Sequence, residues 1–177
     1  MREKFENILL IAGSGQNVGK TTFACQIIAN EKAKNPVAIK ITPHMHKITK
    51  GLEEIEKAVN GSLFEETDNT THKDSSLFLQ NGAVKSYVIL ANDSGLKESF
   101  TALQKLLPSA NPIVIESAAL VNIIQPGLFV VVFSDQANSE IKRPSDLQKA
   151  DLIVVSNGKR FLPAPEKISF KNGWTIK

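Results

Sequence analysis

The stretch from Gly13 to Thr22, GSGQNVGKTT, contains the residue types that bind the phosphates of a nucleotide. Such binding needs backbone N–H groups that converge on one point, a cation, and a hydroxyl that shares a Mg²⁺ ion with the phosphates. Gly15 and Gly19 permit the tight turn that brings those N–H groups together. We expect the phosphate-binding residues to be Gly15, Gln16, Asn17, Val18, Gly19, Lys20, Thr21 and Thr22.

The last three of these residues have separate expected roles. Lys20 reaches the β- and γ-phosphates, Thr21 ligates Mg²⁺, and Thr22 contacts an α- or β-phosphate oxygen. The alternative interpretation is a glycine-rich turn between a strand and a helix with an incidental Gly-Lys-Thr. An apolar strand, the turn, the lysine and a helix follow one another in the required order, which favours a phosphate loop. The strict pattern has glycine where this chain has Ser14.

A phosphate loop needs an acidic residue at the end of a neighbouring strand to hold the magnesium shell. The apolar run 113–117 offers Glu116 at its carboxyl end, where the ligands of open α/β sheets gather. The alternative is a surface glutamate that happens to end a strand. We therefore expect Lys20 and Glu116 to be the catalytic residues and Thr21 and Glu116 to be the metal ligands.

Short apolar strands alternate with helix-like segments along most of the chain, which predicts helices on both sides of a parallel sheet. The expected fold is α/β, a three-layer sandwich with a mostly parallel sheet of about six strands, in one nucleotide-binding domain over residues 1–177. The predicted strands are 7–12, 37–42, 87–91, 113–117, 128–133 and 152–156. The predicted helices begin at Lys20, near Asp74 and near Gly95, and a short helix is expected at 52–59 inside an irregular region, 44–71. The tail from 157 to 177 suggests a small hairpin.

Three residues around the second predicted strand are candidates for a second ligand. Lys40 is a charge inside an apolar strand, so it lies either at the exposed end of the strand or against a bound phosphate or carboxylate. His44 and His46 follow in the loop and either contact a metal or an anionic substrate or are solvated.

Four further residues have an ordinary structural alternative. Asp74 and Ser75 either face a substrate or simply cap the next helix. Cys25 is expected to be a small core residue of the first helix. Asn157 follows the last strand, where many such proteins hold the nucleotide base, but its loop also has the composition of an ordinary turn.

Composition narrows the class of protein. The chain has 177 residues, 42% hydrophobic and 22% charged, with a net charge of +3, which gives no indication of nucleic acid or an anionic membrane as partner. No apolar stretch is long enough to span a bilayer, and a single cysteine suits a reducing cytosol. These features predict a soluble cytoplasmic protein.

The loop resembles that of dethiobiotin synthetase, a phosphate-loop NTPase of the SIMIBI class. That family's loop also begins one residue early and ends in Val-Gly-Lys-Thr, so Gly13 matches its leading glycine and Ser14 the next residue. The synthetase is usually longer than this chain, and its later Gly-Gly is absent here.

The region after the loop is more similar to adaptor protein B of molybdopterin-guanine dinucleotide biosynthesis. That family has a lysine at the end of the second strand and then a histidine-rich loop, which Lys40, His44 and His46 match. It also has an Asp-Ser pair that opens a helix, matched by Asp74 and Ser75 in KDSSLFLQNGA. The strand that follows ends in Glu-Gly in that family, whereas this chain has Glu116 and then Ser117.

The resemblance implies a homodimeric, Mg²⁺-dependent protein that binds GTP, with Lys40, His44, His46, Asp74 and Ser75 at a site for a pterin cofactor or another small molecule. Two functions follow from it. The first is a GTP-binding adaptor with weak NTPase activity in molybdenum cofactor biosynthesis. The second is an ATP-dependent ligase or kinase that acts on a small carboxylate, as the synthetase does. No Asn-Lys-x-Asp motif is present to distinguish GTP from ATP.

Overall fold

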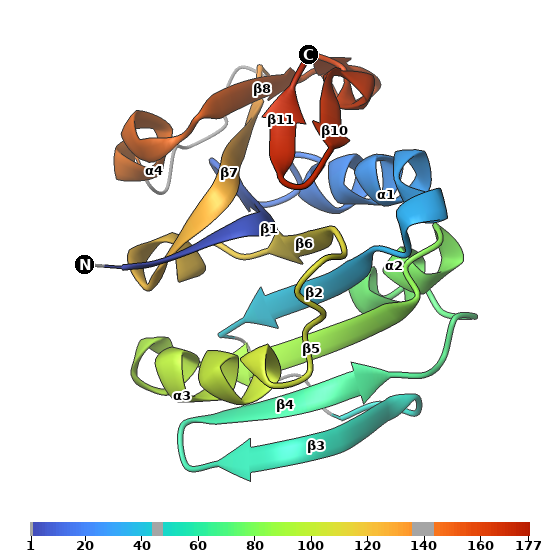
Figure 1. The fold of residues 1–177 in the computed structure, drawn as a ribbon, viewed down its shortest axis with the longest axis vertical. Helices are drawn as coiled ribbons and strands as arrows, with labels where there is room; N and C mark the ends of the chain where they lie inside the picture. The colour runs from blue at the N-terminus through green and yellow to red at the C-terminus, as the bar shows by residue number, and fades with distance from the viewer. Residues whose placement is uncertain (1, 44–47, 136–143) are drawn as a thin grey trace.

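A nine-stranded mixed sheet runs through the protein, with strand order β3-β4-β5-β2-β6-β1-β7-β8-β9 (Figure 1). The structure is a computed structural model and describes residues 2–43, 48–135 and 144–177. The strands of the large sheet are β1 (Glu3–Gly13), β2 (Val37–Thr42), β3 (Leu52–Ala58), β4 (Gly61–Glu66), β5 (Lys85–Ala91), β6 (Ile113–Glu116), β7 (Ile124–Ser134), β8 (Leu152–Ser156) and β9 (Phe161–Leu162). A separate pair consists of β10 (Ile168–Phe170) and β11 (Trp174–Ile176).

The strands at the centre of the sheet are those that the sequence predicts. β5, β2, β6, β1, β7 and β8 pair in parallel, and each contains one of the six predicted apolar runs. β4 and β3 extend one edge and β9 extends the other, all by antiparallel pairing. The expectation of about six strands was therefore too low. The additional strands lie at the edges, where a strand is not covered on both faces and needs no continuous apolar run.

The short helix expected at 52–59 is wrong: Leu52–Ala58 is strand β3, which pairs with β4 across a two-residue turn. Its sequence, LEEIEKA, is rich in helix-forming residues and is exposed over most of its length, so it has no apolar alternation. Pairing with β4 overrides that propensity. The turn residues are Val59 and Asn60, and Gly61 is the first residue of β4. Gly61 is required because a Cβ there would lie 2.3 Å from Ser99 Oγ on α3 (Asp93–Gln104).

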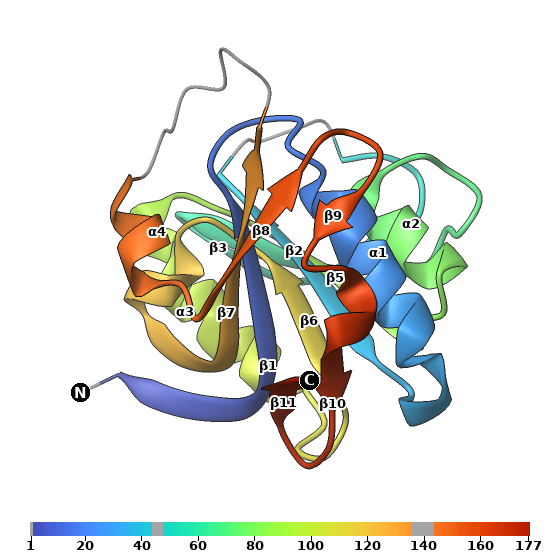
Figure 2. The same ribbon diagram turned by 90° about the horizontal axis from the view of Figure 1, so that it is seen from above.

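Helices cover both faces of the sheet, as expected (Figure 2). α1 (Lys20–Asn30) and α2 (Asp74–Gln80) lie on one face, and α3 and α4 (Pro144–Lys149) lie on the other. The apolar face predicted for the first helix is fully buried at Phe23, Ala24, Ile27 and Ile28. α3 buries Leu96, Phe100 and Leu103 against the opposite face. These two cores hold the strand ends that carry the candidate site. Short 3₁₀ segments occur at Lys32–Lys34, Leu120–Asn122 and Pro165–Lys167.

The small hairpin suggested for the tail is present as β10 and β11. It packs against the core on the α1 side through Ile168, Phe170 and Trp174. The Trp174 indole N–H donates to the carbonyl of Asn7 at 2.9 Å, so the tail is fixed to the first strand. Within the described residues, no helix combines the length and the apolar character needed to cross a membrane.

Candidate functional site

The loop between β1 and α1 has the backbone of a tight phosphate-binding turn. Two of its residues have positive φ, Asn17 at 55° and Gly19 at 92°, and α1 begins immediately after Gly19 at Lys20. Asparagine and glycine are the residues that adopt this left-handed conformation most readily. The helix N-terminus, with its unpaired N–H groups, therefore lies directly at the end of the loop.

Gly13 allows the lysine to fold back over the loop. A Cβ on Gly13 would lie 2.6 Å from Cδ and 2.8 Å from Cγ of Lys20, and 2.8 Å from Cγ2 of Val18. Lys20 Nζ donates to the carbonyl of Gly15 at 2.8 Å, so the lysine stem crosses the position that a Gly13 side chain would occupy. Residue 13 is therefore glycine because a side chain there would clash with Lys20 and Val18.

Ser14 takes the place of the missing glycine without conflict. Its backbone N–H donates to the carbonyl of Val132 on β7 at 3.0 Å, directly after β1 ends at Gly13. Its side chain is 2% exposed, and its Oγ has no hydrogen-bond partner among the described residues. The strict glycine position is therefore buried in this protein, and its φ is not positive.

A chain of polar contacts links α1 to two neighbouring strands. Thr21 Oγ1 donates to Glu116 Oε2 at 2.9 Å, and Lys40 Nζ donates to Glu116 Oε1 at 2.6 Å. The same ammonium lies 2.6 Å from Asp74 Oδ2. Glu116 is buried, with 2% of its surface exposed. The sequence stretches that carry these residues are far apart, and the sheet brings them together because β6 lies between β1 and β2.

These contacts decide between the two placements that the sequence allowed for Lys40, the exposed end of its strand or a position against an anion. Lys40 lies inside β2 and is half-buried, and the anions that it faces are two carboxylates of the protein itself. Burial alone would lower the pKa of Lys40, but the charges of Glu116 and Asp74 outweigh it, and the net pKa is raised. Lys40 is therefore held as an ammonium.

Asp74 does not cap α2. It begins the helix, as predicted, but the N-cap residue is Lys73, whose side chain makes no cap hydrogen bond. The capping interpretation is therefore wrong for Asp74, whose carboxylate turns to Lys40 instead.

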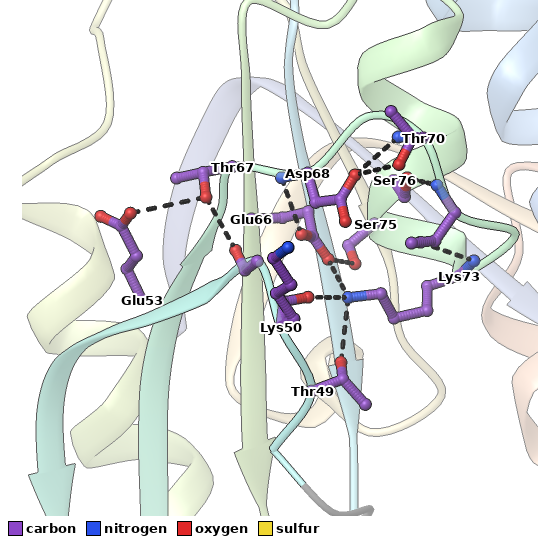
Figure 3. Close-up of polar contacts among 12 residues, drawn as sticks. Thr49, Lys50, Glu53, Glu66, Thr67, Asp68, Thr70, Lys73, Ser75 and Ser76 are labelled. Atoms are coloured by element: carbon purple, nitrogen blue, oxygen red, sulfur yellow. Dashed lines mark hydrogen bonds and ion pairs between the residues drawn. The ribbon is translucent and has the colours of Figure 1, made fainter.

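Ser75 is part of a buried cluster centred on Glu66 (Figure 3). Glu66 Oε2 accepts from Ser75 Oγ at 2.8 Å and lies 2.9 Å from Lys73 Nζ, and Glu66 Oε1 accepts from the Asp68 backbone N–H at 3.0 Å. The Glu66 side chain is fully buried. The cluster thus ties the residues on both sides of Asp74 to the end of β4.

A cavity of about 860 Å³ adjoins the loop and the polar chain. Of the residues predicted for the site, its lining contains Gln16, Asn17, Gly19, Lys20, Thr21, Thr22, Lys40, Asp74, Ser75 and Glu116. The volume is in the range of ligand sites in proteins, roughly 300–1,000 Å³. Gly15 and Val18 belong to the loop but do not line this cavity.

Of the predicted residues that the structure describes, Asn157 lies apart from this group. The Asn157 side chain accepts from the backbone N–H groups of Lys159 and Arg160 at 3.0 and 2.8 Å, the geometry of an ordinary turn, and it does not line the cavity. His44 and His46 lie outside the described residues.

The cavity also has lining residues that the sequence did not single out. They are Thr42, Thr49, Leu52, His72, Lys73, Val88 and Leu90. Val88 and Leu90 resemble any other residues of a buried strand, so no local signal could identify them. Thr42 lies at the carboxyl end of its strand, where such a site is expected.

The residues present fit a nucleotide-bound magnesium ion. Mg²⁺ in such sites takes one or two protein oxygen ligands together with phosphate oxygens and waters. The Thr21 hydroxyl and the Glu116 carboxylate are such oxygens, and they lie at the helix end where the phosphates are expected.

Cys25 is a core residue, as predicted. It is 8% exposed and lies in α1 behind the site. Burial, with smaller contributions from the charges of Asp74 and Glu116, raises the pKa of its thiol to about 12.

Comparison with known proteins supports the fold and leaves the family open. No protein-family model and no curated protein matches this chain. Among solved structures, the "apo" form of LpxK from Aquifex aeolicus in complex with ATP matches with a TM-score of 0.52 and 14% sequence identity. The match covers 88% of this chain and 50% of that one, so this chain spans about half the length of the matched protein. The fold is that of a P-loop NTPase.

Proposed function

We propose that this protein binds a nucleoside triphosphate with Mg²⁺ and hydrolyses or transfers the γ-phosphoryl group. One observation carries the proposal: the Thr21 hydroxyl, directly after the loop lysine, lies 2.9 Å from the buried carboxylate of Glu116. A phosphate loop that only binds phosphate has no need of a buried acid at this position. The pair is the combination that magnesium-dependent phosphoryl transfer uses.

Each residue of the site has a role in this proposal. The loop N–H groups and the α1 N-terminus bind the phosphates, and Lys20 neutralises the β- and γ-phosphate charge. Thr21 and Glu116 hold Mg²⁺, which supplies further charge neutralisation at the γ-phosphate. Lys40 holds the Glu116 carboxylate in place, because its ammonium lies 2.6 Å from Glu116 Oε1.

The finer proposal is a homodimeric, GTP-binding adaptor in molybdopterin-guanine dinucleotide biosynthesis, with a pterin as second ligand. It is supported by the similarity of Lys40, His44, His46, Asp74 and Ser75 to that family's sequence pattern. The competing candidate is an ATP-dependent ligase or kinase. It is favoured by the cavity, which extends beyond the loop to Val88 and Leu90, and by the ATP in the LpxK structure.

Titration with fluorescent analogues of ATP and GTP in the presence of Mg²⁺ tests the proposal. Saturable binding of one analogue is expected, and Lys20→Ala should abolish it, since the charge that neutralises the phosphates is lost. Lys97→Ala is the matched control, because Lys97 is exposed on α3 on the opposite face of the sheet. Failure of both analogues to bind would refute the proposal.

A second experiment tests the role of Glu116. Glu116→Gln keeps the side-chain shape but removes the charge, so turnover should fall at least about tenfold, as expected when a hydrogen bond to a charged group is lost. Nucleotide affinity should change much less, because the loop and Lys20 remain. Equal loss of turnover and affinity would show that Glu116 does not act on the metal.

A further inference from the structure

One row of side chains crosses the sheet from the loop strand towards the edge. Ile11 pairs with Glu116, Glu116 with Lys40, Lys40 with Val88, and Val88 with Phe64. Residues paired directly across strands point to the same face of a sheet. The row therefore passes from charged side chains beside the phosphate loop to apolar side chains two strands further on.

The apolar end of this row is part of the cavity. Val88 and its neighbour Leu90 line the cavity, and Leu52 on β3 completes this wall. These three side chains and Phe64 form a small cluster separate from the two main cores. A ligand that reaches from the phosphate loop into this part of the cavity needs an apolar body.

The Glu66 cluster fixes a further part of the cavity wall, through Thr49, Lys73 and Ser75. Lys73 Nζ contacts Glu66 at 2.9 Å, Thr49 Oγ1 at 2.9 Å and the carbonyl of Lys50 at 3.2 Å (Figure 3). It thereby joins the segment before β3 to the start of α2. Because its central carboxylate is fully buried, this wall is built before any ligand arrives.

The charges at the polar end select the head group of the ligand. Lys40 is bound by two carboxylates and Lys73 by one, so both ammonium groups are already balanced by the protein. Lys40 faces two carboxylates, so this group retains one net negative charge, and Asp74, which lines the cavity, would repel a carboxylate head group. A cationic head group beside Asp74 would be repelled by the Lys40 ammonium, which lies 2.6 Å from the Asp74 carboxylate. A neutral hydroxyl that donates to Asp74 avoids both conflicts.

We infer that this cavity is a binding site for a small neutral alcohol with an apolar body, placed with its hydroxyl at Asp74 and its body on Leu52, Val88 and Leu90. The inference rests on the proposed nucleotide site, because the hydroxyl then lies on the side of the cavity that faces the phosphate loop. It differs from the small carboxylate that the resemblance to the synthetase implies.

Three probes with one apolar body and different head groups test the inference: naphthalenemethanol, naphthoate and naphthylmethylamine. Dissociation constants are measured by ligand-observed NMR with Mg²⁺ and a non-hydrolysable ATP analogue present. The alcohol should bind at least about tenfold more tightly than either charged probe, since each of those meets a like charge. Asp74→Asn should reduce the difference in affinity between the alcohol and naphthoate, because the charge that repels naphthoate is removed.

Variants of the apolar wall locate the binding. Leu52→Ala and Val88→Ala should each weaken alcohol binding by about tenfold, as expected for lost contacts in an apolar pocket. Val84→Ala is the matched control, because Val84 is 52% exposed and does not line the cavity. Thermal unfolding of each variant confirms that it is folded.

The outcomes separate this inference from the proposed function. Absence of nucleotide binding in the same sample refutes the proposed function. If the nucleotide binds, three results each overturn the inference alone: no saturable binding of the alcohol, a charged probe that binds as tightly, or alcohol binding that both wall variants leave unchanged.

Discussion

Gly13→Ala should weaken nucleotide binding although residue 13 lies outside the strict phosphate-loop pattern. The new Cβ would lie 2.6 Å from Lys20 Cδ and 2.8 Å from Val18 Cγ2, distances that real contacts do not reach. Val18 is 3% exposed and packed in the core, so the flexible lysine stem has to move. The ammonium then leaves the loop, and with it one charge-assisted contact to the phosphates.

The loss of that contact sets the magnitude. A hydrogen bond to a charged group contributes about 1.5–3 kcal/mol, which corresponds to a roughly 10- to 100-fold rise in the dissociation constant. Overpacking at the buried side of the loop should also cost about 1–3 kcal/mol in the free energy of unfolding. Fluorescent-nucleotide titration and thermal unfolding measure the two effects on the same protein.

Ser14→Gly is the decisive comparison, because it restores the strict pattern by placing glycine five positions before Gly19, with four residues between them. The backbone N–H of Ser14 donates to Val132 and the φ of Ser14 is not positive, so glycine brings no benefit there. Nucleotide affinity should stay unchanged, and the free energy of unfolding should fall by about 0.5–1 kcal/mol from added backbone freedom. If Ser14→Gly tightened binding while Gly13→Ala had no effect, the steric argument for Gly13 would be refuted.

Three further predictions concern buried ionisable groups. Glu66→Ala should lower the free energy of unfolding by about 1–3 kcal/mol because it leaves the buried Ser75 hydroxyl without its acceptor, whereas Glu65→Ala, whose ion pair is exposed, should cost about 0–1 kcal/mol in chemical denaturation. Cys25, with a pKa of about 12, should react with DTNB at pH 8 far more slowly in the folded protein than in guanidinium chloride, and equal rates would contradict its burial. The raised pKa of Lys40 means that its pairing stabilises the fold fully below the usual lysine pKa of 10.5 and is lost as pH rises through the higher folded value. Lys40→Met should therefore show a shallower alkaline decline in Tm than wild type, and parallel declines would contradict the pairing.

The sequence by itself predicted the parts of this protein that depend on local chemistry. The phosphate loop was visible because glycines, a lysine and a hydroxyl residue follow an apolar strand and precede a helix in the required order, and the positive φ of Asn17 was seen only in the structure. The six parallel strands were visible because strands covered on both faces must be continuously apolar. The core face of α1 followed from helical spacing, and all of its predicted residues are buried.

Only the tertiary structure decided which residues share the site. Lys40 and Glu116 contact each other because β6 pairs with β2 in one register, and a shift of a single residue would turn each side chain to the other face. The same register places Val88 and Leu90 beside the charged residues, although nothing in their own segment distinguishes them from core. β3 is the reverse case: its residues favour a helix locally, and hydrogen bonding to β4 makes them a strand. Local propensity does not encode the pairing between segments that are distant in the sequence. That pairing determines which residues, such as Val88 and Leu90, line the part of the cavity beyond the phosphate loop.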